Sequence, residues 1–223
     1  MDSYINKVVV KKETEAADTA KVIASAVQKA LGWVLDNDGV TVWMSTKKEL
    51  GVRFKNDSGI YPCIVNAYGT TGEYQGCSVG FTNTSTVTIY WLKTALGTIC
   101  LGITDQHTVI PTLSVLFGKN ENGTYVGVTM GSSVSDGFSI RSIGADEAIT
   151  MRLVTNYALN LPVTLIKMPD ILHGGVFSDV YMILTTPANI SSTILYVSGR
   201  YYRVVRKIGD TSGVTPTLAI PVD

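Results

Sequence analysis

The chain has 223 residues, enough for one large β domain or two smaller ones that fold without a metal or a disulfide. Lysine plus arginine and aspartate plus glutamate count 18 each, so the formal net charge is zero and the basic excess of nucleic-acid-binding proteins is missing. Charged residues make up only 16% of the chain, against about 25% in typical soluble domains. A weakly charged surface favours association, so we expect a subunit of an assembly; a well-packed core under a serine- and threonine-rich surface is the alternative.

The cysteine pattern indicates neither a metal nor a disulfide framework. Cys63, Cys77 and Cys100 are an odd number and lack the short spacing of a zinc site. We expect reduced, buried thiols in a protein made in a cytosol, and no cofactor.

The most apolar stretch also argues against membrane insertion. It runs from Val87 to Ile103, contains Lys93, and is shorter than the ~20 apolar residues that a spanning helix needs. Alternation over its first residues predicts a strand instead.

The N-terminal 35 residues contain an extended segment and a helix. Residues 1–12 include the β-branched run YINKVVVKK and are predicted to form an arm or an edge strand. Residues 13–35 are predicted to be an amphipathic helix, from about Thr14 to Leu35. Its apolar residues recur at steps of three and four and share one face: Ala17, Ala20, Ile23, Val27, Leu31 and Val34.

From Val40 onward the apolar pattern has a period of two, broken by glycine, asparagine and aspartate clusters every eight to twelve residues or so. The predicted strands are Val40–Ser45, Gly51–Lys55, Tyr61–Tyr68, Gly76–Phe81, Thr86–Lys93, Gly97–Thr104, Thr108–Phe117, Thr124–Met130, Phe138–Ile143, Thr150–Val154, Val163–Met168, Val180–Thr185, Thr193–Val197 and Arg200–Ile208. The fold class is therefore mainly β (α+β): an antiparallel β-sandwich or barrel-like body with one N-terminal amphipathic helix and extended terminal arms.

The domain organisation has two interpretations. Residues 36–145 form a β-rich body and residues 146–223 a second β lobe, or the two make one domain. The threonine- and proline-rich end, Asp210 to Pro221, is predicted to be a tail that lies along another surface. Lys55–Tyr61 and Lys119–Tyr125 share the pattern K-N-x-x-G-x-Y, which indicates two similar hairpin loops or an internal duplication.

Only two histidines are present, which restricts nucleophilic catalysis and metal binding. Asp105 lies two residues before His107 in a loop-like segment, and no G-x-S-x-G elbow supplies a serine nucleophile. His173-Gly174-Gly175 has the letters of a lipase oxyanion segment, but the parallel α/β sheet of those enzymes is not predicted. A glycine turn between two strands is the interpretation we adopt.

Acidic residues form two further candidates. Asp36-Asn37-Asp38-Gly39 resembles the start of a calcium loop, but its spacing is compressed and its twelfth position is Lys47, so we expect a turn. Asp136, Asp146 and Glu147 cluster weakly, and paired carboxylates for glycoside hydrolysis require a fixed separation that a sequence does not show. We assign no catalytic, cofactor-binding or metal-binding residue.

Aromatic residues are the more suggestive feature. Tyrosine supplies a large contact area with a polar tip and is enriched at interfaces, but it is also a good strand residue with one wet face, and both interpretations stay open. The prominent aromatics are Tyr61, Tyr68, Tyr74, Tyr90, Trp91, Tyr125, Tyr181, Tyr196, Tyr201 and Tyr202.

The C-terminal third resembles segments of tailed-bacteriophage virion proteins, especially tail, baseplate and fibre-associated subunits. The residues that carry the resemblance are Tyr181-Met182-Ile183-Leu184-Thr185-Thr186-Pro187, Ser191-Ser192-Thr193-Ile194-Leu195-Tyr196-Val197 and Ser198-Gly199-Arg200-Tyr201-Tyr202-Arg203-Val204-Val205. They cover about a quarter of the chain as a strand–loop–strand–turn–strand pattern and transfer no site residue. The N-terminal helix departs from the pattern of simple tail fibres.

Three functions are hypotheses at this point. The first is a non-enzymatic structural subunit of a phage virion, made in the host bacterial cytoplasm, whose partners are other virion subunits and copies of itself. The second is a carbohydrate- or host-surface-binding module in which exposed Trp33, Trp43 or Trp91 stacks on sugar rings. The third is a β-rich hydrolase around Asp105 and His107. None of the three requires nucleic acid.

Overall fold

The computed structural model describes residues 6–13, 16–57, 61–69, 72–74, 86–104, 112–113, 115–132, 137–142, 149–152, 165–170, 173–183, 194–207 and 218–222. Among them is one helix, α1 (Ala16–Leu31). The strands are β1 (Asn6–Lys11), β2 (Val34–Leu35), β3 (Thr41–Trp43), β4 (Leu50–Asp57), β5 (Tyr61–Gly69), β6 (Gly72–Tyr74), β7 (Thr86–Lys93), β8 (Ile99–Thr104), β9 (Thr112–Leu113), β10 (Val115–Lys119), β11 (Tyr125–Ser132), β12 (Gly137–Ser142), β13 (Ile149–Arg152), β14 (Leu165–Pro169), β15 (Val176–Ile183), β16 (Ile194–Val197), β17 (Arg200–Lys207) and β18 (Leu218–Pro221).

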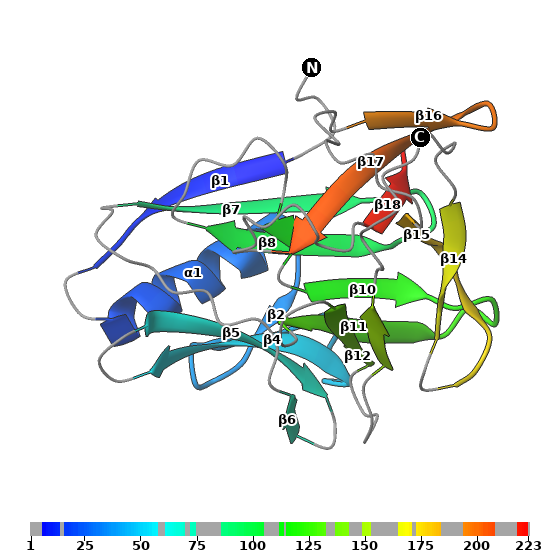
Figure 1. Ribbon diagram of the computed structural model, residues 1–223. Coiled ribbons are helices and arrows are strands. Elements are labelled where there is room, and N and C mark those ends of the chain that lie inside the picture. Colours follow the sequence, from blue (N-terminus) through cyan, green and yellow to red (C-terminus); the bar gives the residue numbers. More distant parts are fainter. Residues whose placement is uncertain are drawn as a thin grey trace.

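The strands form three sheets (Figure 1). The largest has the order β1-β7-β8-β10-β11-β12-β13, the second β14-β15-β18-β17-β16, and the third β2-β3-β4-β5-β6. Neighbouring strands are antiparallel except where β9 pairs in parallel with β17. The protein is thus mainly β, with open sheets stacked in a sandwich-like α+β fold, as the sequence predicted; the sheets of the described residues do not close into a barrel.

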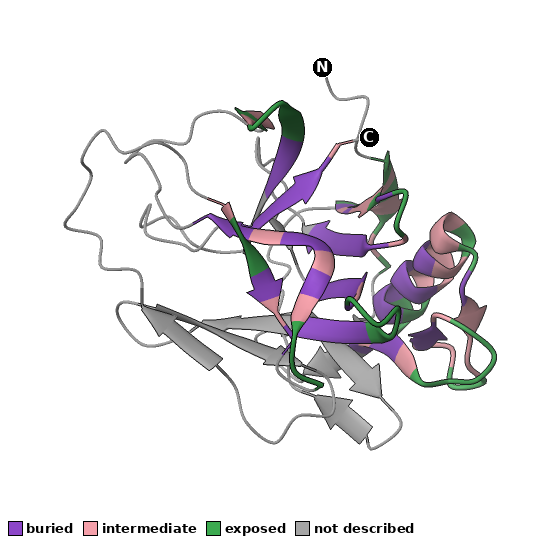
Figure 2. Cartoon of the chain, turned by 90° about the vertical axis from the view of Figure 1, so that its right-hand side faces the viewer, coloured by how far each residue is buried: buried purple, intermediate pink, exposed green. Residues whose placement is uncertain are grey.

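The largest sheet is the middle layer, because its central strands are buried on both faces. Ile99 and Leu101 of β8 join the core that includes α1 and the third sheet. Cys100 between them, with Leu116 of β10, faces the second sheet. A strand that is buried on both faces has apolar residues at every position, whereas a half-buried strand alternates apolar and polar residues. The sequence ICLGI of β8 (residues 99–103) is of the first kind. These inner strands are mostly purple in Figure 2.

The two layers meet closely at a glycine. A Cβ atom on Gly118 of β10 would lie 2.8 Å from the Cδ1 atom of Phe177 on β15. Only a residue without a side chain lets the Phe177 ring pack this near to the sheet. Phe177 is fully buried, and burying a side chain of this size contributes about 2–3 kcal/mol.

The helix packs its apolar stripe between the first and third sheets (Figure 1). Ile23, Ala24 and Val27 are fully buried there. The helix ends at Leu31, not at Leu35 as predicted. Gly32 has φ +69° and closes the helix in the left-handed conformation, after which Val34 and Leu35 pair with Trp43 and Val42 as a strand.

Both ends of the chain pair within sheets where the structure describes them. Asn6–Lys11 pairs with β7 along its whole length, so of the two predictions for this segment, an arm or an edge strand, the edge strand is confirmed. Leu218–Pro221 lies between β15 and β17 and is buried, so it is a core strand and not a surface tail. Leu218 and Ile220 pack on one face and Ala219 on the other, which is why four residues are held inside the sheet. The rest of the predicted tail, 210–217, lies outside the described residues.

Strands from both sides of residue 146 share sheets. β12 pairs with β13 across the predicted division, and β9 pairs with β17. The division between 36–145 and 146–223 therefore does not coincide with a division between sheets. The predicted strand Gly76–Phe81 lies outside the described residues.

The K-N-x-x-G-x-Y segments lie in antiparallel hairpins. Lys119 pairs with Tyr125 across a turn in which Gly123 has φ +80°, as the hairpin interpretation predicted. In the first segment Asp57 pairs with Tyr61, and residues 58–60 between them lie outside the described residues.

Candidate functional site

The most exposed aromatic pair lies on the hairpin of β16 and β17. Tyr196 faces Tyr201 across the two strands, with ring centroids 4.8 Å apart and an interplanar angle of 48°. The two residues are 64% and 57% exposed. Ser198 and Gly199 form the turn with φ of 51° and 80°, the double left-handed geometry that matches the twist of a two-residue hairpin.

The opposite face of this hairpin is anchored in the protein. Leu195 and Tyr202, the neighbouring cross-strand pair, pack in a small core with Val204 and Ala219. The Tyr202 ring meets Tyr181 edge to face at 5.3 Å. Since residues alternate between faces, anchoring this pair holds Tyr196 and Tyr201 out in solvent.

The edge of the hairpin is open as well. β16 ends the second sheet, and no further strand pairs with it among the described residues. An exposed aromatic pair beside an unpaired strand edge is the combination that favours association, because both the rings and the backbone groups gain partners.

Two of the three tryptophans of the second hypothesis are buried. Trp33 and Trp43 are each 5% exposed, so that expectation is wrong for both. Trp33 meets Phe117 edge to face at 5.3 Å in the core, and Trp43 donates its indole N–H to Asp36. Trp91 is half-buried and lines a groove between β1 and α1.

The other tyrosines whose side chains are described fit the interpretation as strand residues. Tyr202 is buried, Tyr90 and Tyr181 are half-buried, and Tyr125 is 39% exposed beneath the ammonium group of Lys119. These behave as strand residues. The side chains of Tyr61, Tyr68 and Tyr74 lie outside the described residues.

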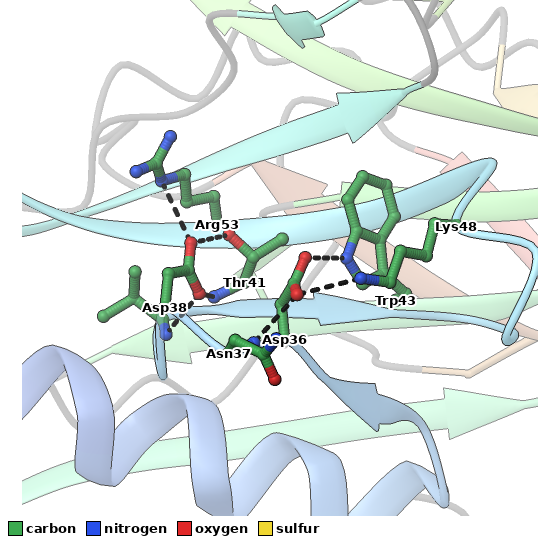
Figure 3. A network of polar contacts seen from close by, with 8 residues as sticks. Asp36, Asn37, Asp38, Thr41, Trp43, Lys48 and Arg53 are labelled. Carbon is green, nitrogen blue, oxygen red and sulfur yellow. Dashed lines mark hydrogen bonds and ion pairs between the residues drawn. The ribbon is translucent and has the colours of Figure 1, made fainter.

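The Asp36–Gly39 segment is a turn, as expected, and its carboxylates are occupied by protein donors (Figure 3). Asp36 accepts from Trp43 Nε1 at 2.8 Å, from the Asn37 backbone N–H at 2.8 Å and from Lys48 Nζ at 2.9 Å. The hydrogen bond from Trp43, with those from Lys48 and Asn37, lowers the pKa of Asp36 to about 2.

Asp38 is tied to the strand that comes next in the chain. Its Oδ1 accepts from the backbone N–H groups of Val40 and Thr41 at 2.9 and 2.8 Å, and its Oδ2 accepts from Thr41 Oγ1 at 2.6 Å. Burial raises the pKa of Asp38, but the hydrogen bonds from Thr41 and Val40 outweigh it and the pKa falls below its ordinary value. Because the oxygens of both aspartates accept hydrogen bonds from nearby donors, the segment is a turn and not a calcium loop.

A second polar cluster connects the β10–β11 and β14–β15 turns. Asp170 is 2% exposed, and its Oδ2 accepts from Asn120 Nδ2 at 3.0 Å and lies 3.1 Å from His173 Nδ1. The His173 side chain is 40% exposed. Asn120, also 2% exposed, accepts from the backbone N–H groups of Asn122 and Thr124 at 3.0 Å each.

This aspartate–histidine pair holds a turn. Gly174 and Gly175 have φ of +73° and +82°, so the glycine-turn interpretation of His173-Gly174-Gly175 is confirmed. Nucleophilic catalysis would require a hydroxyl or thiol in contact with the imidazole. Within the described part of the chain, the hydrogen bonds of His173 go to Asp170.

A third cluster buries an aspartate between the two largest sheets. Asp179 on β15 accepts from Thr94 Oγ1 at 2.5 Å and from Thr98 Oγ1, both in the β7–β8 turn region. Burial, reinforced by the Asp179 carboxylate, raises the pKa of the Cys100 thiol well above its ordinary value. The expectation of a reduced, buried thiol is confirmed for Cys100.

Sequence reasoning missed Asp170 and Asp179. A signal existed for Asp179, because it alternates with Phe177 in a strand and therefore points toward the same core. Its threonine donors are 81 and 85 residues away in the chain, and no local pattern identifies them.

Several candidates lie outside the described residues: Asp105, His107, Asp136, Asp146, Glu147 and Cys77. Cys63 is in β5, whose side chains are likewise outside them. Where side chains are described, no group of three or more histidine, cysteine, aspartate or glutamate residues is arranged to hold a metal ion. The described helix is not long and apolar enough to cross a membrane.

Comparison with known proteins adds no relative. No protein family, no curated protein and no solved structure matches this chain. The residues and contacts of the chain itself are therefore the basis for any functional proposal.

Proposed function

We propose that this chain is a non-enzymatic structural subunit that acts through repeated protein–protein interfaces, with the β16–β17 hairpin as its main contact. The observation that carries the proposal is the pair Tyr196 and Tyr201, more than half exposed on a hairpin whose other face is fixed in the core. Rigid aromatic side chains bury a large area at little entropic cost.

The setting we propose is the tail or baseplate of a tailed phage. Its support is the resemblance of residues 181–205 to virion proteins, and this segment contains both exposed tyrosines. The low share of charged residues, 16%, is consistent with a subunit whose surface is covered by neighbours.

The alternative is a carbohydrate-binding module. Tyr196 and Tyr201 are the observation that favours it, since exposed aromatic rings also stack on sugars. In that case a glycan, and not another subunit, would cover the hairpin.

The test is the native mass by light scattering after gel filtration, from micromolar to millimolar protein. The variant Tyr196→Thr/Tyr201→Thr removes both rings but keeps residues that favour a strand. Leu96→Ser is the matched control, because Leu96 is a 52% exposed apolar residue in the β7–β8 turn.

We expect a defined oligomer for the natural chain and for Leu96→Ser, and a monomer for the double variant. A monomer at every concentration for all three would contradict self-assembly through the hairpin. Glycan-array binding that the double variant loses would then favour the alternative.

A further inference from the structure

A groove of about 570 Å³ lies between β1 and α1. Val8, Val10 and Trp91 line its sheet side, and the helix contributes a stripe at positions 22, 25, 26, 29 and 30. The volume is within the range of roughly 300–1,000 Å³ that is typical of ligand sites. The groove is on different elements from the tyrosine hairpin, so a role for it is independent of the proposed function.

The helix stripe that lines the groove is separate from its core stripe. Ile23, Ala24 and Val27 are fully buried against the sheets, whereas Val22, Ser25 and Ala26 are only partly covered. Small side chains on this second stripe leave space beside β1, so the second stripe of α1 is covered only in part.

β1 gives the groove a strand edge. It ends the largest sheet and pairs with β7 alone among the described residues (Figure 1). Val8 and Val10 point toward the helix side and are half-buried, while Val9 between them is 57% exposed. A strand added to this edge would place every second side chain on the same side as Val8 and Val10, inside the groove.

Lysines lie on both faces of this strand edge. Lys7 and Lys11 are exposed on the face of β1 opposite to Val8 and Val10, and Lys29 lines the groove from the helix. Among the described contacts, no carboxylate pairs with any of these three lysines, whereas Lys21 on the same helix is paired with Asp18 at 3.4 Å. Acidic side chains on the occupant would be suitable partners for these lysines.

We infer that this groove binds an extended peptide segment of another protein by strand addition to β1, with small apolar residues at alternate positions and acidic residues between or beside them. The edge of β1 supplies backbone hydrogen bonds, and the groove takes the apolar side chains of the peptide. The lysines favour a peptide with negatively charged residues. A second copy of this chain is the poorer occupant, because edge-to-edge pairing would bring the same lysines together.

The first experiment measures the affinity of a fluorescein-labelled hexapeptide of alternating glutamate and valine, with an alternating lysine–valine hexapeptide for comparison. We expect saturable binding of the acidic peptide. Because the valines enter the groove, the glutamates lie on the face of Lys7 and Lys11, so Lys7→Glu should weaken binding about fivefold or more and should improve binding of the basic peptide. Lys47→Glu, in the β3–β4 turn, is the matched charge control and should leave both affinities unchanged.

Two further measurements separate strand addition from general attraction between charges. Ala30→Phe fills the groove from a half-buried position that faces it and should abolish binding without lowering Tm. Amide hydrogen exchange should slow on binding at alternate residues of Asn6–Lys11, those whose N–H groups point away from β7.

Absence of saturable binding up to millimolar peptide would overturn the inference. Binding that Lys7→Glu and Lys47→Glu weaken equally, or that leaves the exchange of β1 amides unchanged, would do the same. Dimerisation that Ala30→Phe abolishes would identify a second copy as the occupant and overturn the choice of partner.

Discussion

Two groups of polar contacts in this protein differ in where the donors to an aspartate come from. The carboxylates of Asp36 and Asp38 are satisfied by residues within about a dozen positions, at the surface. Asp179 is 2% exposed and accepts from threonines more than 80 positions away.

The difference lies in what holds each group in place. A local turn keeps its donors near even when surrounding contacts loosen, and water replaces a lost hydrogen bond at little cost. A buried carboxylate has no such replacement, so its donors must be positioned by the packing of two sheets. Four substitutions test this contrast, from the largest expected effect to the smallest.

Asp179→Ala should cost about 3 kcal/mol of unfolding free energy, measured by urea unfolding. It leaves two buried threonine hydroxyls without their acceptor and opens a small space between the sheets. Thr98→Val in the same background should add little, because the contact is already lost. A loss below about 1 kcal/mol for Asp179→Ala would contradict the claim that the buried aspartate contributes more to stability than the surface aspartates.

Asp170→Ala should cost about 2 kcal/mol by the same measurement, since it removes the acceptor of buried Asn120 and of His173. The half-exposed His173 ring can turn to water, which makes the effect smaller than at Asp179. His173→Gln is the control and should cost less than half as much. If Asp170→Ala and His173→Gln lost equal amounts of unfolding free energy, the contact with His173, and not that with Asn120, would be the stabilising one.

Asp36→Asn should cost about 1 kcal/mol at neutral pH, an effect limited because water screens this surface site. The pKa of Asp36 is about 2 in the folded protein against 3.8 ordinarily, so its contribution is complete above 3.8 and disappears as the pH falls toward 2. The difference between natural and variant chains should therefore shrink over that interval. A difference that stays constant with pH would show that charge is not involved.

Lys48→Ala should cost no more than about 0.5 kcal/mol, the smallest effect of the four, because the ion pair with Asp36 is solvent-exposed. Raising the salt concentration should reduce the difference further. Chemical denaturation at low and high salt measures it. A loss as large as that of Asp179→Ala would mean that the turn supports the core.

Much of the fold follows from periodicity. The helix face, the strand Thr86–Lys93 and the turn at Asp36–Gly39 were predictable because each depends on residues close in sequence: a repeat of three to four, a repeat of two, and aspartates beside their own backbone donors. The Lys119–Tyr125 hairpin was predictable for the same reason.

The sequence by itself determined a mainly β chain with one amphipathic helix, a neutral net charge and an abundance of tyrosine, since these depend on composition and local spacing. Only the tertiary structure decided that Leu218–Pro221 is a core strand, that Trp33 and Trp43 are buried, and that Tyr196 and Tyr201 are not. The same residue types appear in exposed and buried strands, and which face is covered depends on the sheet that packs against it. Strand pairing and sheet stacking join residues far apart in the chain, and no local pattern specifies them.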